Sequence, residues 1–148
     1  MKGNFRSAFP DDVDKINLHP VYSPNGSYKE VAKQYLSLPL NIAYTILDPL
    51  GEPLAIAGGL FIYNKVMEIW TIVDKRVFDM PLYYAKAMKS LLDSCFKNFE
   101  VNRLQVVIRA DQPWAMHWGK FLGFTKEGIL RKYGQEGVDY IMFAKVRD

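Results

Sequence analysis

Hydrophobic and polar positions follow two different periods along this chain, and these periods predict both helices and strands. Apolar residues recur at helical spacing in residues 28–38, 82–99 and 113–122, and acids in a first turn indicate a shorter helix at residues 11–16. Apolar runs rich in β-branched and aromatic residues indicate strands. These strands are expected at residues 5–8, 40–47, 54–63, 66–73, 103–110, 125–133 and 139–146.

The order of these elements predicts the fold class. Three strands joined by short turns, at residues 40–47, 54–63 and 66–73, indicate an antiparallel meander. The last of them is followed by the amphipathic helix 82–99 and the apolar strand 103–110, which makes a right-handed β-α-β unit with parallel strands. A second helix and a C-terminal hairpin complete the chain. We therefore expect an α/β (α+β) fold whose mixed sheet is antiparallel at its ends and parallel in the middle.

Composition narrows the class of protein further. A length of 148 residues with 49% hydrophobic residues fits one domain over residues 1–148. The 19 basic and 16 acidic residues are interspersed, so the net charge of +3 permits an anionic ligand without indicating nucleic acid. A sequence pI near 8.9 nevertheless leaves a nucleic-acid-associated protein as a third, weaker alternative, which salt-dependent DNA binding would test.

Targeting signals and cysteine content indicate the cellular compartment in which the protein is expected. No run approaches the roughly 20 apolar residues of a membrane span, and the N-terminus shows no apolar signal region. The single cysteine, Cys95, excludes an internal disulfide and favours a reducing compartment. We expect a cytoplasmic protein without a membrane partner. Oligomeric state stays open.

Four segments carry a resemblance to a known family. They are the hairpin at residues 42–59, the strand 67–73, the helix 112–122 ending in Leu122-Gly123-Phe124, and the closing hairpin at residues 127–143. In their order and spacing they resemble the GNAT superfamily of acyltransferases. That resemblance implies a GNAT-like fold and direct, metal-free transfer of an acetyl group from acetyl-CoA to an amine. The implied partners are a CoA thioester and an amine acceptor, either a small molecule or a protein.

The chain departs from the family pattern at the loop that holds the CoA pyrophosphate. Family members carry glycines there, and their backbone N–H groups surround the phosphates at a helix N-terminus. Residues 74–82 contain no glycine, Pro81 has no N–H, and Asp79 would repel phosphate. The resemblance leaves Lys75 and Arg76 as the cations near the phosphates, and it predicts weak CoA binding.

A second departure lies in the helix before Gly123. Many members place a tyrosine four residues before that glycine, where it protonates the leaving thiolate, but this chain has Gly119. Gln112 replaces the asparagine expected in this helix, and the resemblance implies that Gln112 and Trp118 lie beside the cofactor. A tryptophan-rich fourth strand, a proline in the loop and a tryptophan in the last helix are similar to a divergent subgroup encoded by tailed bacteriophages.

The fourth strand of the fold supplies both a base and a cofactor surface. In an apolar strand, desolvation favours the neutral form of Glu68, which would suit a general base working near neutral pH. The alternative is a carboxylate paired with a nearby lysine or arginine. The resemblance implies that backbone groups of Ile72 and Val73 bind the pantetheine arm where the fourth strand separates from the fifth, although both also fit a buried strand.

Other polar residues are weaker candidates for a catalytic or metal-binding role. Tyr133 and Tyr140 on the last hairpin could replace the missing acid, but tyrosines on strands more often pack. His117 and His19 are distant in sequence and have no cysteine or acid cluster nearby, so no metal site is expected.

The two departures from the family pattern, in the loop at residues 74–82 and at Gly119, also motivate a rival function. That rival is a catalytically impaired structural or interaction protein of the same fold, including a component of a phage particle.

Overall fold

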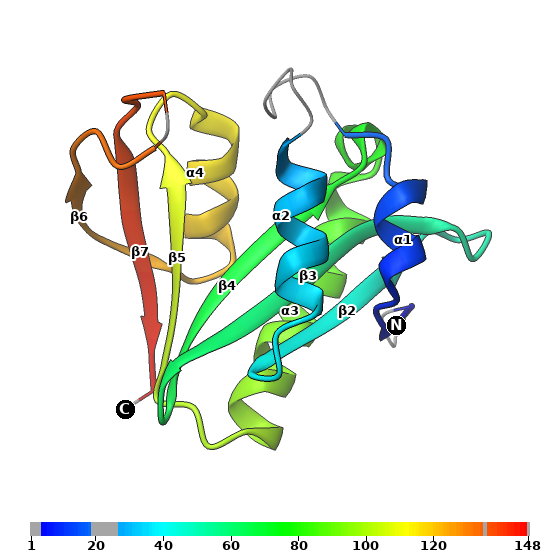
Figure 1. Cartoon of the computed structure of the whole chain (residues 1–148), viewed down its shortest axis with the longest axis horizontal. Helices are drawn as coiled ribbons and strands as arrows, with labels where there is room; N and C mark the ends of the chain where they lie inside the picture. Colours follow the sequence, from blue (N-terminus) through cyan, green and yellow to red (C-terminus); the bar gives the residue numbers. More distant parts are fainter. Residues whose placement is uncertain (1–3, 19–26, 135, 148) are drawn as a thin grey trace.

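The computed structural model describes residues 4–18, 27–134 and 136–147, and over these ranges the chain forms one mixed sheet with helices on both faces (Figure 1). His19 lies outside the described residues. The elements, in chain order, are β1 (Phe5–Ser7), α1 (Pro10–Lys15), α2 (Ser27–Leu36), β2 (Asn41–Leu47), β3 (Pro53–Tyr63), β4 (Val66–Val73), the 3₁₀ helix η1 (Lys75–Asp79), α3 (Pro81–Asn98), β5 (Arg103–Arg109), α4 (Pro113–Phe121), β6 (Thr125–Leu130) and β7 (Tyr140–Val146).

The sheet confirms the predicted fold class. Its strand order is β1-β2-β3-β4-β5-β7-β6, and every neighbouring pair is antiparallel except β4 and β5. The meander β2-β3-β4 and the parallel β4-α3-β5 unit both form as the sequence predicts. In Figure 1, α1 and α2 cover one face and α3 lies behind the sheet.

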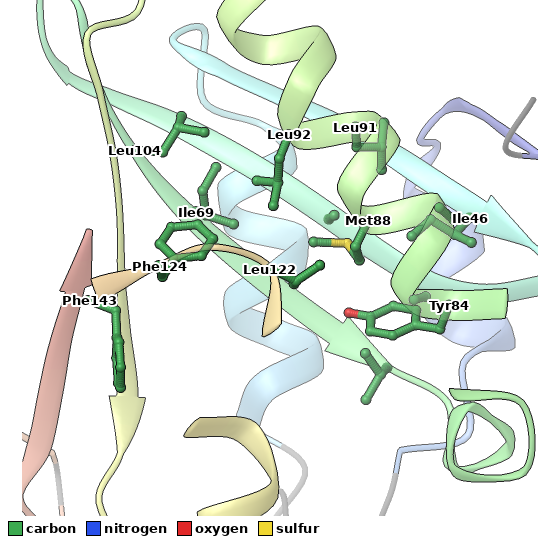
Figure 2. Packing of buried hydrophobic residues seen from close by; sticks show 14 of the residues in the cluster. Ile46, Ile69, Tyr84, Met88, Leu91, Leu92, Leu104, Leu122, Phe124 and Phe143 are labelled. Atoms are coloured by element: carbon green, nitrogen blue, oxygen red, sulfur yellow. The ribbon is translucent and has the colours of Figure 1, made fainter. Parts of the chain in front are cut away.

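Two apolar cores hold these layers together. The smaller lies under α1 and α2 and contains Val13, Ile16 and Ala32 with Ile56 and Ile72 of the sheet. The larger lies on the opposite face, where the helix α3 packs. Figure 2 shows the α3 side chains Tyr84, Met88 and Leu92 directed toward Ile69, Leu122 and Phe124. Because successive strand residues point to opposite faces, β4 contributes Ile69 to one core and Ile72 to the other.

The central parallel pair is short. Among the described residues, β4 and β5 pair at Val66↔Arg103, Met67↔Leu104 and Glu68↔Gln105. Beyond Glu68 the two strands diverge, as Figure 1 shows. β4 continues beside β3 as far as Val73↔Ala55, and β5 continues beside β7 as far as Arg109↔Tyr140. The sheet therefore opens at its centre while each half stays fully paired on its outer side.

Two glycines occupy positions that their surroundings or backbone restrict. Gly58 in β3 marks a close approach, because a Cβ there would lie 2.2 Å from the indole of Trp70. Gly123 ends α4 with a φ of 95°, and its N–H donates to the carbonyl of Lys120 while that of Phe124 donates to Gly119. This pair of bonds is a Schellman cap, which satisfies the last carbonyls of the helix.

Several element boundaries differ from the expected ones by one residue, and three differences bear on the site. The predicted strand 125–133 ends at Leu130, since Lys132 adopts a left-handed φ of 52° that an extended strand does not accommodate. The helix expected at 28–38 ends at Leu36. The loop expected at residues 74–81 contains a 3₁₀ turn, Lys75–Asp79, and α3 begins at Pro81 itself.

Candidate active site

The divergence of β4 and β5 produces a cavity of about 310 Å³. Its walls are the strands on either side of the gap, with α2 at one opening and α3 and α4 at the other. Tyr35 lines it from the α2 side, and Tyr84 and Met88 line it from the α3 side. The cavity therefore crosses the sheet, so two reactants could approach one another from opposite faces.

Backbone groups of β4 face this gap in a pattern set by the strand register. The carbonyl of Lys65 accepts N–H groups from Asn102 and Arg103 on the β5 side, while the N–H of Asp74 donates to Leu54 on the β3 side. Successive residues of a strand direct their N–H and C=O groups to opposite neighbours. This alternation directs the groups of Ile69, Thr71 and Val73 toward the gap, and those of Ile72 toward β3.

That alternation separates the two residues predicted to hold a pantetheine arm. Val73 presents its backbone to the gap, whereas Ile72 pairs with Ile56 in the β3 ladder and lines the cavity with its side chain. Sequence reasoning missed Ile69 and Thr71. The sequence could have indicated them, because the residues of a strand whose backbone groups face one side recur at every second position. With Val73 facing the gap, Thr71 and Ile69 must face it too.

Glu68 lies at the narrow end of the cavity, where the parallel pairing ends. Its Oε1 accepts a hydrogen bond from Nε2 of Gln105 across 3.1 Å. Oε1 of Gln105 in turn accepts from Nε of Arg103 at 2.9 Å, and that guanidinium binds Glu127. Over the described ranges, no lysine, arginine or histidine nitrogen lies within 4.0 Å of the Glu68 carboxylate. Its hydrogen-bond partner is the neutral amide of Gln105. The described residues therefore do not show the alternative, a Glu68 carboxylate paired with a lysine or arginine.

An aromatic cluster closes the opposite end. Trp118 of α4 stacks on Phe78 at 6.1 Å between ring centroids, and it lies 4.7 Å from the ring of Tyr84. Trp114 meets the edge of Phe78 at 5.0 Å. Trp118 and Trp114 both line the cavity, as does Gln112, the N-cap residue of α4. The position of Trp118 is therefore that of a cavity wall fixed by aromatic packing.

Tyr84 is a polar group that the sequence analysis did not single out. It is buried, lines the cavity, and its side chain hydrogen-bonds with that of Thr71 on β4. Burial raises the pKa of Tyr84 well above the ordinary value of a phenol, and the bond with Thr71 offsets only part of that rise. Its hydroxyl is therefore a neutral hydrogen-bond donor at any physiological pH.

The turn between β4 and α3 is closed by its own hydrogen bonds. The N–H groups of Lys75 and Val77 donate to the carbonyls of Asn17 and Asp74, and that of Met80 donates to Val77. The N–H of Arg76 donates to the Asp74 carboxylate at 3.0 Å. These four donors already have acceptors, so the turn does not offer the open row of N–H groups that a glycine loop would.

Arg76 is held by acceptors from three parts of the chain. Its Nε donates to Asp74 at 3.1 Å, Nη1 binds the carboxylate of Asp48, and Nη2 donates to the carbonyl of Pro53 at 2.8 Å. The two carboxylates are buried, and although desolvation opposes their charged form, bonds from backbone N–H groups and from the Arg76 side chain together lower the pKa of each. Arg76 thus ties the β2–β3 turn to the end of β4, while the neighbouring Lys75 is exposed.

A second arginine, Arg109, lies at the wide end of the cavity with acids around it. Its guanidinium donates to Asp111 at 3.0 and 2.9 Å and approaches Glu136 at 3.7 Å. It also hydrogen-bonds with Tyr28, which in turn bonds with Tyr140. Burial and the bond with Tyr28 raise the pKa of Tyr140 to about 12. At this end of the cavity, each of these charged groups therefore has an oppositely charged partner.

The remaining predicted residues lie at the rim. Tyr133 follows β6, is 58% exposed, and packs on Tyr140 with 5.5 Å between ring centroids. His117 is exposed on α4. In the described part of the chain, no group of three or more histidine, cysteine, aspartate or glutamate residues could hold a metal ion. Within the same ranges no helix is long and apolar enough to cross a membrane.

This architecture matches solved acyltransferase structures. No protein-family model and no curated protein matches the chain. Among solved structures, a chimera of spermidine N-acetyltransferase SpeG from Vibrio cholerae with hSSAT aligns with a TM-score of 0.75 and 12% identity, covering 99% of this chain and 96% of that one. Vibrio cholerae SpeG crystallised with manganese aligns with a TM-score of 0.74 and 13% identity, covering 98% and 92%. The fold is therefore the GNAT-like fold expected from the sequence.

Proposed function

We propose that this protein is an N-acyltransferase that moves an acetyl group from acetyl-CoA to an amine. The observation that carries the proposal is the gap between β4 and β5, a cavity lined from both faces of the sheet, with Glu68 where the parallel pairing ends. The similar solved structures are named as spermidine N-acetyltransferases, which supports an amine as the class of acceptor.

The reaction needs a base at the amine and a donor at the departing sulfur. The Glu68 carboxylate takes a proton from the acceptor ammonium, directly or through water, and the freed amine attacks the thioester carbonyl. A C–N bond forms, the C–S bond breaks, and the thiolate takes up a proton. Tyr84 supports this step as a neutral hydrogen-bond donor inside the cavity, a position that the exposed Tyr133 does not share.

The pantetheine arm fits the gap itself. It is a slender chain with amide groups, and the strand β4 directs backbone groups of Ile69, Thr71 and Val73 toward the gap. Ile72 contributes a buried side chain beside the arm, and Gln112 and Trp118 form the wall toward α4. These groups bind the part of the cosubstrate that enters the sheet.

The protein offers fewer binding partners for the phosphates of acetyl-CoA than for its pantetheine arm. Because the backbone donors of the turn at residues 75–80 are engaged, charge has to substitute for a glycine cradle. Lys75 is the exposed cation of that turn and Arg76 holds Asp48 and Asp74. We therefore expect acetyl-CoA to bind more weakly than it does in acyltransferases with a glycine loop.

A ligand titration tests the proposal. Saturating acetyl-CoA should raise the melting temperature, because a ligand that binds the native state alone stabilises it. Incubation with an amine should then release free CoA thiol, and Glu68→Gln should slow that release by about 100-fold. The variant should still bind acetyl-CoA. A wild-type protein that binds acetyl-CoA without transferring its acetyl group to any amine would refute the catalytic proposal.

A specific observation favours a second candidate. The closed turn after β4 and the glycine at position 119 both remove groups that acyltransferases of this fold use. A protein that kept the fold as a structural or interaction module, including one in a phage particle, would have no need of them. Under this candidate, acetyl-CoA leaves the melting temperature unchanged. An upward shift would eliminate it.

A further inference from the structure

We propose that the acceptor is a monoamine with an apolar or aromatic body, and that it is not a polyamine. This inference rests on the proposed function for its chemistry and on the charges of the cavity for its specificity. The chamber concerned is the part of the cavity on the α2 face, between α2 and the diverging strands. Glu68 and Trp70 of β4 border it, and Tyr35 of α2 faces them.

The chamber contains a single site suited to an ammonium group. Glu68 is the one acid among the described residues that line the cavity, and its hydrogen-bond partner is the amide of Gln105. The undescribed segment at residues 19–26 contains no aspartate or glutamate. None of the described cations lies beside this carboxylate, and an incoming ammonium would supply one.

Aromatic rings stand next to this carboxylate. The rings of Tyr35 and Trp70 lie 5.4 Å apart between centroids, at an angle of 50°. Trp70 is held in place by a hydrogen bond from its indole N–H to Asn41 at 2.9 Å and by its contact with Gly58. Glu68 is close enough to Tyr35 for its charge to raise the pKa of that phenol in addition to the larger effect of burial. Ring faces beside a carboxylate bind a cation from both sides.

The rest of the chamber disfavours a second positive charge. Val31 and Val107 line the wall beyond the rings, and an ammonium placed against them would lose the water on that side and gain no partner from these two side chains. Farther along β5, the acids Asp111 and Glu136 are already bound by the guanidinium of Arg109. A polyamine would have to place a second ammonium on the apolar wall or near a guanidinium. An apolar body occupies the same wall favourably.

Binding measurements separate this inference from catalysis. We would titrate the protein calorimetrically with 2-phenylethylamine, its neutral counterpart 2-phenylethanol, and spermidine. We expect 2-phenylethylamine to bind at least tenfold more tightly than either of the others. Glu68→Gln should abolish its advantage over the alcohol. Tyr35→Leu should weaken it about fivefold, by loss of a cation–π contact. Tyr63→Leu removes a tyrosine that is 73% exposed and outside the cavity lining, and it should change nothing.

The outcomes distinguish the two proposals. Spermidine binding as tightly as 2-phenylethylamine, with the affinity lost in Glu68→Gln, would overturn the monoamine inference and leave the acyltransferase proposal intact. Equal binding of the amine and the alcohol would also overturn it, because the chamber would then recognise the ring alone. Selective binding of 2-phenylethylamine without acetylation in the presence of bound acetyl-CoA would refute the acyltransferase and with it the role of the monoamine as acceptor, while the chamber's preference for a monoamine would stand.

Discussion

Gln105 donates a hydrogen bond to Glu68 across the last residue pair that joins β4 to β5. The bond spans 3.1 Å and lies where the sheet opens into the cavity. Arg103 fixes the other end of the Gln105 amide at 2.9 Å, so the amide cannot rotate without losing a bond. The carboxylate of Glu68 is therefore oriented by the donor Gln105, which Arg103 holds, and Arg103 in turn donates to the carboxylate of Glu127 on β6.

The substitution Gln105→Leu tests this orientation. A leucine side chain would preserve most of the bulk and remove the donor, so we expect kcat to fall about tenfold with the dissociation constant of acetyl-CoA unchanged. The KM for the acceptor amine should stay unchanged while kcat falls, because the carboxylate remains in place but loses the bond that orients it. A purely structural role would lower the melting temperature and leave kcat unchanged, and that result would contradict the assignment.

Much of this arrangement was available from the sequence, and its limits have physical causes. Strand and helix periods depend on local patterns, so the meander, the β-α-β unit and the C-terminal hairpin could be predicted. The bond between Glu68 and Gln105 could not, because it depends on the register of two strands separated by a long helix. The sequence indicated Glu68 as a polar residue in an apolar strand, and the structure supplied the partner.

Arg76 illustrates the same limit of sequence-based prediction. Its place in the loop after the fourth strand suggested phosphate binding, because the sequence alone does not indicate which acceptors surround its side chain. The β2–β3 turn brings Asp48 and Pro53 to its side chain, and both lie more than twenty positions away in the chain. Tyr84 was missed for a related reason, because its hydroxyl acquires significance from Thr71 on another element.

Neighbouring substitutions should separate charge at the phosphates from support of the fold. We expect Lys75→Ala to leave the melting temperature unchanged and to weaken acetyl-CoA binding about threefold to fivefold, with a smaller loss at high salt. Arg76→Ala should instead destabilise the fold by about 2 kcal/mol, because it leaves the buried Asp48 and Asp74 carboxylates without their cation. Chemical denaturation and calorimetric titration measure the two effects. Reversal of the pattern would show that Arg76 is the phosphate ligand.

Two tyrosines can be compared as donors to the leaving sulfur. Tyr84 is buried in the cavity wall, and Tyr133 is exposed at the rim. We expect Tyr84→Phe to lower kcat about tenfold, since it removes one hydrogen bond while preserving the ring that packs on Trp118. Tyr133→Phe should stay within about twofold of the wild type. Steady-state release of CoA thiol provides the measurement. Equal losses in both variants would move the donor to the rim.

Asp12 should give the fold a specific dependence on acid. Its buried carboxylate accepts bonds from Arg6, the Phe9 N–H and Thr45, and these outweigh desolvation and hold its pKa at about 2, against 3.8 for an unperturbed aspartate. A carboxyl group with a lowered pKa in the folded state contributes its full stability above the unfolded value and loses it as the pH falls through the folded one. We therefore expect about 2 kcal/mol of unfolding free energy to disappear between pH 4 and pH 2 in the wild type and to be missing from that interval in Asp12→Asn. Asp11→Asn, which alters an exposed carboxylate one residue earlier, should keep the wild-type slope in urea denaturation. If Asp12→Asn followed the wild-type curve between these two pH values, the ion pair with Arg6 would contribute no net stability to the folded chain.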